Sequence, residues 1–234
     1  MNTMDYLQEF LKTSIQSEDY TGRHVLTLFA LAHATKGKKY LELGVFDGLT
    51  TTPILLGAKL NGGHLTSVDI RKPNFVCPEE LRPHWTFHQG DALEFLRNLD
   101  DSIVFDFVFI DDLHTYHQVQ QEIALLEKHL TPSSIITLHD LMYDNTEPHY
   151  HTSPALPDTE WAEGGPYRAV NELPRRKWEW ATLPWSNGLT ILRKKGNVID
   201  ENPWNMRVKR WLRSFSPKLE RYIVKKLNRR SHAA

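Results

Sequence analysis

Cysteine is almost absent from this chain. Cys77 is the only cysteine among the 234 residues, which excludes an intrachain disulfide and a zinc site built from several cysteines. Long apolar runs are also missing, so no segment predicts a membrane-spanning helix. The first twenty residues contain acidic side chains and no continuous apolar run, unlike a secretory signal peptide. Together these absences predict a cytoplasmic protein.

The net charge is small but unevenly distributed. The formal charge is −1, yet residues 203–234 contain ten Lys or Arg and one acid, Glu220, which gives +9 there and −10 elsewhere. Trp211 and Phe215 share an apolar stripe in this tail. Residues 203–230 therefore predict a basic amphipathic helix that associates with a membrane surface. The alternatives are packing against its own domain or a second copy in a homodimer, and, least favoured, nucleic-acid binding.

The rest of the chain alternates between strand and helix patterns. Apolar residues at helical spacing predict two helices within residues 1–36, as a lid or an interface. Downstream, the patterns predict strands at 40–43, 64–69, 85–88, 103–110 and 133–138, helices at 49–60, 92–98, 116–130 and 167–173, and an antiparallel hairpin of 178–183 with 189–193. Residues 141–166 are rich in Pro, His, Tyr and Trp without periodicity, which favours a substrate-covering loop.

A glycine turn follows the first predicted strand. Gly44 and Gly48 lie between this strand and the next helix, and neither has a Cβ that would keep a ligand away from the backbone. This arrangement predicts a nucleotide-type pocket. The spacing Glu-x-Gly-x-x-x-Gly differs from the G-x-G-x-x-G of dinucleotide enzymes, so we expect a smaller, cationic ligand.

Acidic residues lie at the ends of four successive strands. They are Glu42, Asp69, Asp91 and Asp111. In a parallel α/β sheet the carboxyl ends of the strands meet at one edge, where ligands bind, and an acid about 20 residues beyond the glycine turn binds ribose hydroxyls. A solvated loop acid is the alternative for Asp69. Asp91 also suits the N-cap of the helix that follows it, and both roles are compatible.

The segment Glu42-Leu43-Gly44-Val45-Phe46-Asp47-Gly48 resembles the first motif of class I S-adenosylmethionine (SAM) methyltransferases, and the strand-end acids extend the resemblance over residues 38–195. It implies SAM as cofactor and a Rossmann-like, doubly wound, mostly parallel seven-stranded sheet with an antiparallel C-terminal hairpin, in a domain spanning residues 37–196. The loop would wrap the methionine part of the cofactor, and Gly90-Asp91-Ala92 would hold the adenine. The cofactor-binding residues implied are Glu42, Gly44, Phe46, Gly48, Asp69, Asp91, Ala92 and Asp111.

A narrower resemblance rests on Phe109-Ile110-Asp111-Asp112-Leu113-His114-Thr115-Tyr116 together with Ile135-Ile136-Thr137-Leu138-His139-Asp140. These segments look like the metal-dependent small-molecule O-methyltransferases of the catechol and macrolide-sugar type. In that group, acids after the fourth and fifth strands bind Mg²⁺, which implies Asp111 and Asp140 here. His139 stands where the family often has a carboxylate or amide, which shifts the preference toward Mn²⁺ or Fe²⁺ and makes His139 a further candidate ligand.

Methylation of a hydroxyl requires removal of its proton, because the neutral hydroxyl is a poor nucleophile. His114 lies three residues beyond Asp111, and an unperturbed pKa of about 6.5 suits a general base. His139 is the alternative base, and His114 would then only hydrogen-bond its loop. The expected catalytic residues are therefore His114, Asp111 and His139. The predicted function is SAM-dependent O-methylation of a small molecule or sugar. The alternatives are a non-catalytic SAM-binding or membrane-associated adaptor and an RNA methyltransferase.

Overall fold

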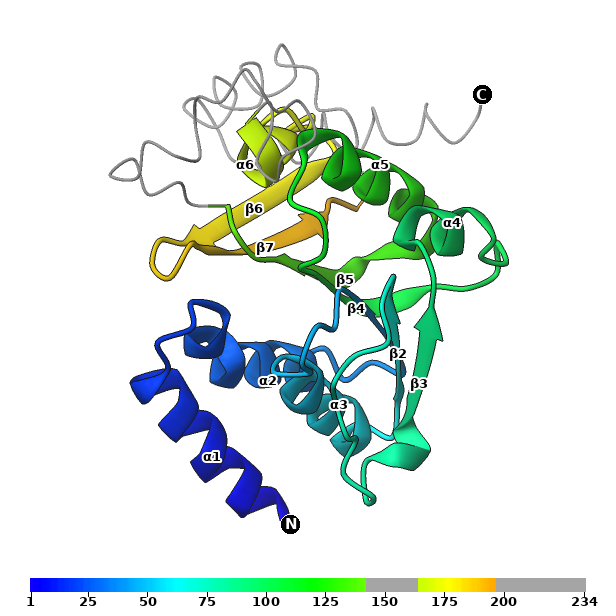
Figure 1. The fold of residues 1–234 in the computed structure, drawn as a ribbon. Helices are drawn as coiled ribbons and strands as arrows, with labels where there is room; N and C mark the ends of the chain where they lie inside the picture. Colours follow the sequence, from blue (N-terminus) through cyan, green and yellow to red (C-terminus); the bar gives the residue numbers. More distant parts are fainter. Residues whose placement is uncertain (142–163, 197–234) are drawn as a thin grey trace, which may run out of the picture. The chain divides into compact units, whose positions relative to one another are not determined.

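The sheet predicted from the sequence is present. The computed structural model describes residues 1–141 and 164–196, where seven strands form one sheet in the order β3-β2-β1-β4-β5-β7-β6 (Figure 1). The strands are β1 (Lys39–Leu43), β2 (His64–Asp69), β3 (Trp85–Gln89), β4 (Phe105–Ile110), β5 (Leu130–Leu138), β6 (Trp178–Leu183) and β7 (Leu189–Lys194). The predicted tail helix at 203–230 and most of the predicted substrate-covering loop lie outside the described residues.

The first five strands are parallel, and the last two close the sheet as an antiparallel hairpin. β1 lies between β2 and β4, with Leu43 paired to both Val68 and Ile110. β7 pairs antiparallel with β5 and with β6. This confirms the Rossmann-like, doubly wound architecture. Because the parallel strands share one direction, the residues that follow β1 to β5 gather at a single edge of the sheet.

Helices cover both faces of the sheet (Figure 1). The α-helices are α1 (Thr3–Gln16), α2 (Val25–Ala34), α3 (Thr51–Leu60), α4 (Ala92–Arg97), α5 (Tyr116–Leu126) and α6 (Gly165–Asn171). The described residues also form three 3₁₀ turns, η1 (Thr21–His24), η2 (Arg82–His84) and η3 (Glu127–His129). α1 begins with a complete capping box, in which Asn2 and Asp5 satisfy each other's backbone N–H groups. The two helices predicted before the first strand are thus confirmed.

Successive residues of the central strand serve two separate cores. In β4, Phe107 and Phe109 pack with α1, α2 and α3, whereas Val108 and Ile110 pack with α4, α5 and α6. All four side chains are at most 3% exposed. Such a two-faced apolar strand is typical of a parallel sheet covered on both sides, and burial of its side chains anchors the edge at which the acids lie.

Several predicted boundaries were wrong, and three of them have a clear physical reason. The helix expected from Leu49 begins at Thr51, because Gly48 has φ +81° and Leu49 N–H donates to Asp47 in a turn. The strand expected from Ile103 begins at Phe105. Leu130 was expected on the helix, but it begins β5 and pairs with Phe105. Its apolar character fits either element, and only the partner strand distinguishes them.

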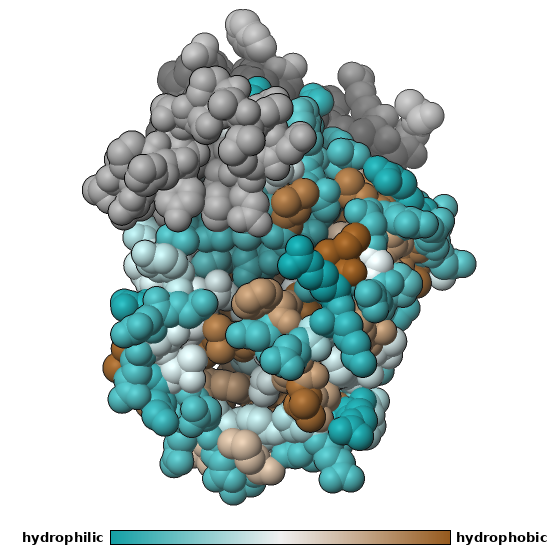
Figure 2. All heavy atoms as spheres, in the orientation of Figure 1, coloured by the Kyte–Doolittle hydropathy of each residue, from teal (hydrophilic) through white to brown (hydrophobic). Residues whose placement is uncertain are grey.

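Among the described residues, none of the helices combines the length and the apolar character needed to span a bilayer. The face in Figure 2 is mostly hydrophilic, and apolar side chains show there in patches rather than in one continuous band.

Candidate active site

A cavity of about 650 Å³ lies at the carboxyl-end edge of the sheet, within the usual range for small-molecule sites of about 300–1,000 Å³. Its walls come from the loops after β1 to β5, from α5 and from η1. The predicted site residues that line it are Gly44, Phe46, Asp69, Asp91, Ala92, Asp111, His114 and Asp140. Glu42, Gly48 and His139 do not line it. The structure therefore brings eight of the predicted site residues to one cavity and leaves the other three outside its lining.

The glycine turn after β1 is tightly held. Gly44 has φ +88°, and a Cβ there would meet the main-chain carbonyl of Asp111 and come within 2.9 Å of Asp112 Cα. Asp69 Oδ2 accepts hydrogen bonds from the N–H groups of Val45 and Phe46, at 2.9 and 3.0 Å. Phe46 has φ +50° although it is not glycine, a conformation that persists only where the surroundings impose it. Asp69 thus shapes the loop, and its predicted contact with ribose remains a prediction.

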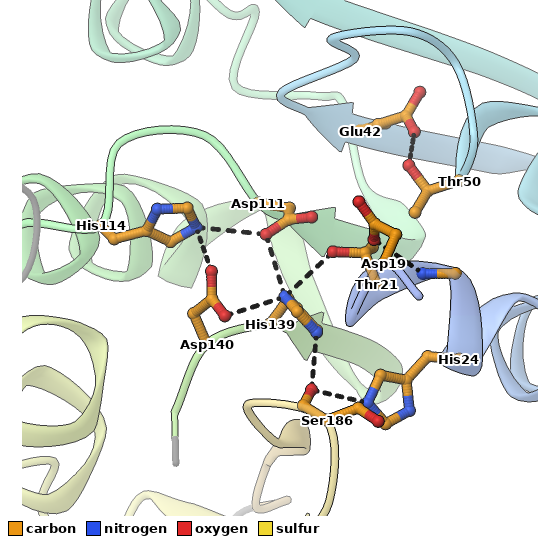
Figure 3. Close-up of polar contacts among 11 residues, drawn as sticks. Asp19, Thr21, His24, Glu42, Thr50, Asp111, His114, His139, Asp140 and Ser186 are labelled. Atoms are coloured by element: carbon orange, nitrogen blue, oxygen red, sulfur yellow. Dashed lines mark hydrogen bonds and ion pairs between the residues drawn. The ribbon is translucent and has the colours of Figure 1, made fainter. Parts of the chain in front are cut away.

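The position expected of Glu42 is corrected by the structure. Because side chains alternate along a strand, Glu42 points to the same face as Tyr40, toward α3 and away from the cavity. Its carboxylate is fully buried and accepts a hydrogen bond of 2.8 Å from the hydroxyl of Thr50 (Figure 3). It also accepts hydrogen bonds from the hydroxyls of Thr51 and Ser67, at 2.9 and 2.6 Å. Glu42 therefore holds the start of α3 against β1 and β2 rather than contacting a ligand in the cavity.

Gly48 has a similar supporting position. It has φ +81°, and a Cβ there would clash with the ring of Phe75. The residue allows the chain to turn into α3 beside that ring, so the position of Gly48 determines the shape of the loop.

Burial of Glu42 makes the stability of the protein depend on pH. Desolvation raises its pKa from 4.5 to about 7, although the hydrogen bonds from Ser67, Thr50 and Thr51 oppose the shift. Between these values the folded protein keeps a proton that the unfolded chain has released. The free energy of unfolding should therefore fall as the pH rises through this range, by about 3 kcal/mol in total.

We expect Glu42→Gln, which cannot ionise, to remove this dependence. Urea unfolding at pH 5 and pH 8 measures the difference in both proteins. Glu79→Gln, at an exposed position, is the control and should keep the wild-type dependence. Equal pH dependence in wild type and Glu42→Gln would contradict the expected role of this carboxyl group.

The wall formed after β3 combines two predicted roles. Asp91 is the N-cap of α4, and its Oδ1 accepts a hydrogen bond of 2.8 Å from Glu94 N–H. Asp91 and Ala92 also line the cavity. A carboxylate has about four acceptor positions, so capping the helix leaves room for the predicted contact with adenine.

Two carboxylates and two imidazoles meet on the opposite wall (Figure 3). His114 Nε2 lies 3.2 Å from Asp111 Oδ1 and 3.0 Å from Asp140 Oδ2. His139 Nδ1 lies 3.5 Å from Asp111 Oδ1 and 3.2 Å from Asp140 Oδ1. Thr21 Oγ1, from η1, lies 3.3 Å from the same nitrogen. The predicted catalytic and metal residues, which follow two adjacent strands, are thus in contact.

The charges in this cluster compensate one another. Burial opposes ionisation of Asp111, but the imidazoles of His139 and His114 outweigh burial and lower the pKa of that carboxyl group. Burial would likewise lower the pKa of His139, but Asp111 and Asp140 reverse the effect and raise it to about 10. A proton on His139 Nδ1 therefore balances the two carboxylates, and a divalent cation would take the place of that proton.

The donor set fits a divalent cation. Ligand atoms of Asp111, His139 and Asp140 all lie within 4.8 Å of one another. Asp140 Oδ1 is buried, and its 3.2 Å contact with His139 Nδ1 is an ion pair without hydrogen-bond geometry. Asp140 also has φ +60°. Two carboxylates with one imidazole suit Mn²⁺ or Fe²⁺ better than an all-oxygen set does. The opposite nitrogen of His139 lies 3.1 Å from the Ser186 carbonyl, the usual partner arrangement of a metal-ligating histidine.

Sequence reasoning missed the residues that reach this wall from distant parts of the chain. They are Thr21 and His24 in η1 and Ser186 between β6 and β7. None belongs to a motif or follows a parallel strand, so no local pattern indicated them. Their positions depend on how α1, α2 and the hairpin pack around β5.

Residues 41–141 match a family model described as a methyltransferase domain. The match includes the glycine turn, the strand-end acids and the His139-Asp140 pair, and it confirms the predicted resemblance over this part of the chain. No curated protein matches the sequence.

Solved structures share the fold at low sequence identity. An O-methyltransferase from Bacillus cereus in complex with SAH, the demethylated form of SAM, has a TM-score of 0.57 and 17% identity, covering 81% of this chain and 90% of that one. The SAH-bound methyltransferase from Podospora anserina has a TM-score of 0.55 and 16% identity, and the match covers 82% of this chain and 88% of that one. The O-methyltransferase of tomaymycin synthesis from Streptomyces achromogenes, in complex with SAM, has a TM-score of 0.55 and 16% identity, and the match covers 75% of this chain and 81% of that one.

Proposed function

We propose that this chain, which carries a methyltransferase domain over residues 41–141, transfers a methyl group from SAM to a hydroxyl oxygen of a small molecule or sugar. The observation that carries the proposal is the meeting of Asp111, His114, His139 and Asp140 at the same cavity as the glycine turn. A cofactor pocket alone needs no such cluster, so its presence favours a catalyst over a SAM-binding adaptor.

The cofactor would occupy the part of the cavity bounded by Gly44, Asp69 and Asp91. Gly44 allows close approach of the ligand to the backbone, and the carboxylates of Asp69 and Asp91 offer acceptors for ribose and adenine. SAM, when bound, supplies an electrophilic methyl group on a positively charged sulfur. The solved structures of similar fold that hold SAM or SAH support this choice of cofactor.

The acceptor hydroxyl would lie beside the carboxylate–imidazole cluster. A divalent cation held by Asp111, His139 and Asp140 would lower the pKa of that hydroxyl. The imidazole of His114, whose Nε2 lies within 3.2 Å of both carboxylates, would take up the proton, and the carboxylates would stabilise the imidazolium that forms. The reaction forms a C–O bond, breaks the C–S bond and leaves the electron pair on sulfur.

Transfer of labelled methyl groups tests the proposal. The protein is incubated with methyl-labelled SAM and a cell extract, which is then separated into lipid, glycan, small-molecule and RNA fractions. Label in the small-molecule or glycan fraction is expected. Label in RNA alone would instead support an RNA methyltransferase, and SAM binding without any label would support a non-catalytic protein.

Asp69→Ala should lower the affinity for SAM by about 10- to 100-fold, because the variant loses both hydrogen bonds that hold Val45 and Phe46 as well as the acceptor for ribose. Titration calorimetry with SAM and SAH measures the change. Asp100→Ala is the control, since it removes a similar carboxylate-to-backbone hydrogen bond, with Ser102 N–H at 2.8 Å, in a turn away from the cavity. Unchanged SAM affinity in Asp69→Ala, or preferential binding of NAD by the wild type, would contradict the assignment.

A further inference from the structure

We infer that His24 is a positioning residue, which acts through the carbonyl oxygen of Ser186 to hold His139 with Nδ1 facing Asp111 and Asp140. The inference rests on the proposed function, because it concerns the same carboxylate–imidazole cluster. It assigns a role to η1 and to the turn between β6 and β7, two segments that no motif indicated.

Two imidazoles share one acceptor (Figure 3). His24 Nε2 and His139 Nε2 each lie 3.1 Å from the carbonyl oxygen of Ser186. A carbonyl oxygen can only accept, and it has two lone pairs. Each imidazole must therefore present an N–H at Nε2. When His139 keeps its proton there, Nδ1 provides the lone pair that a cation requires, and it faces the carboxylates.

The shared carbonyl belongs to a strained turn. Ser186 and Asn187 have φ +50° and +59°, followed by Gly188 at +83°, and left-handed geometry is unfavourable for a non-glycine residue. Gly188 N–H donates to the Trp185 carbonyl at 2.9 Å, which closes the turn. The ring of His24 stacks on Trp185, with centroids 5.8 Å apart and planes at 30°. The hydrogen bond and this stacking together offset the strain and fix the direction of the Ser186 carbonyl.

Burial makes the hydrogen-bond pattern unambiguous. His24 is fully buried, and the side chain of His139 is 1% exposed. The two rings meet edge to face at 5.3 Å. His24 Nδ1 has no hydrogen-bond partner in the described part of the chain, which agrees with a proton on Nε2.

The test compares His24→Gln with His24→Leu. The amide nitrogen of Gln can donate to Ser186 in place of Nε2, whereas Leu fills the space without a donor. Two properties are measured in each protein: the protonation of the His139 nitrogens, by long-range ¹H–¹⁵N NMR of the metal-free protein, and the affinity for Mn²⁺, by calorimetry. Neither property is methyl transfer, so both report on the cluster itself.

We expect wild-type His139 to carry a proton on Nε2. His24→Leu should shift or broaden that signal and lower Mn²⁺ affinity by about 10- to 100-fold, the usual effect of losing an outer hydrogen-bond partner. His24→Gln should restore the signal and bring the affinity to within about threefold of the wild type. Rescue by Gln but not by Leu would show that position 24 requires a hydrogen-bond donor to Ser186 and not only a side chain that fills the space.

His129 provides a matched control. It is also fully buried, and its Nδ1 lies 2.8 Å from the Ile103 carbonyl, beside the other end of β5. His129→Asn and His129→Leu should leave both the His139 signal and the Mn²⁺ affinity unchanged.

Three results would overturn the inference. They are an unprotonated Nε2 on wild-type His139, equal losses in His24→Gln and His24→Leu, and no change in His24→Leu. If His24→Leu fails to fold, the wild-type NMR spectrum still shows whether His139 Nε2 carries a proton, and the Mn²⁺ titration of His24→Gln still shows whether a donor at this position is enough for wild-type affinity. Failure of the wild type to bind Mn²⁺ would refute the metal site of the proposed function, and the NMR comparison would then decide the positioning role by itself.

Discussion

Asp140→Asn should reduce methyl transfer by at least about 100-fold and leave the affinity for SAM within about threefold. Asp140 lines the cavity, 3.0 Å from His114 and 3.2 Å from His139. Removing one carboxylate takes away both a proposed cation ligand and the charge that would stabilise a protonated His114. A 100-fold loss corresponds to about 2.7 kcal/mol of the activation barrier, within the several kcal/mol that such charge stabilisation supplies.

Asn is the appropriate replacement because Asp140 has φ +60°. Asn tolerates the left-handed conformation better than other non-glycine residues, so the variant removes charge with little change in backbone strain. Asp47→Asn, an exposed acid in the glycine turn, serves as the control and should retain activity. Single-turnover methyl transfer and calorimetry with SAM measure the two effects. Parallel losses of transfer and of SAM affinity would place Asp140 in cofactor binding and contradict the proposed role.

Gly44→Ala should abolish measurable SAM binding and lower the free energy of unfolding by about 3 kcal/mol. Part of this cost comes from φ +88°, which an L-residue adopts only with strain. The larger part comes from the collision of the new Cβ with the backbone of Asp111 and Asp112. Those residues follow the central strand, so they cannot withdraw without distorting β4. The turn must move instead, and the wall that approaches the cofactor moves with it.

Gly62→Ala separates strain from collision. Gly62 also has positive φ, at +65°, but a Cβ there would meet only the flexible end of Lys38, at 3.2 Å. Gly62→Ala should lower the free energy of unfolding by about 1 kcal/mol and retain SAM binding. Urea unfolding and calorimetry on both variants provide the comparison. Full SAM affinity in Gly44→Ala would show that the turn does not approach the cofactor as proposed.

The sequence was sufficient to predict those parts of the site whose positions depend only on the direction of the strands. Asp69, Asp111 and Asp140 end or follow parallel strands, and parallel strands bring such residues to one edge whatever the details of packing. Strand alternation also contained the information for Glu42, because an acid two residues after the buried Tyr40 points to the same face. The motif resemblance directed attention to the cavity instead, which is why the buried position of Glu42 was not predicted.

The remaining parts depend on tertiary packing. Leu130 suits a helix as well as a strand, and its pairing with Phe105 settles the matter only in the folded sheet. His24 and Ser186 are 162 residues apart in sequence, and nothing near either of them indicates that they meet at His139. Predicting that contact requires the positions of η1 and the hairpin around β5, which residue patterns alone do not specify.

The hydrogen bond between His139 and Ser186 also has a consequence for the order of events during biosynthesis. The acceptor lies 47 residues after the imidazole, and β7 must pair with β5 before that carbonyl is in place. A nascent chain can already contain the glycine turn and all the strand-end acids while His139 still lacks its anchor. Because the chain is synthesised from its N-terminus, the residues that line the proposed cofactor pocket are all present in the nascent chain before the carbonyl group that anchors His139.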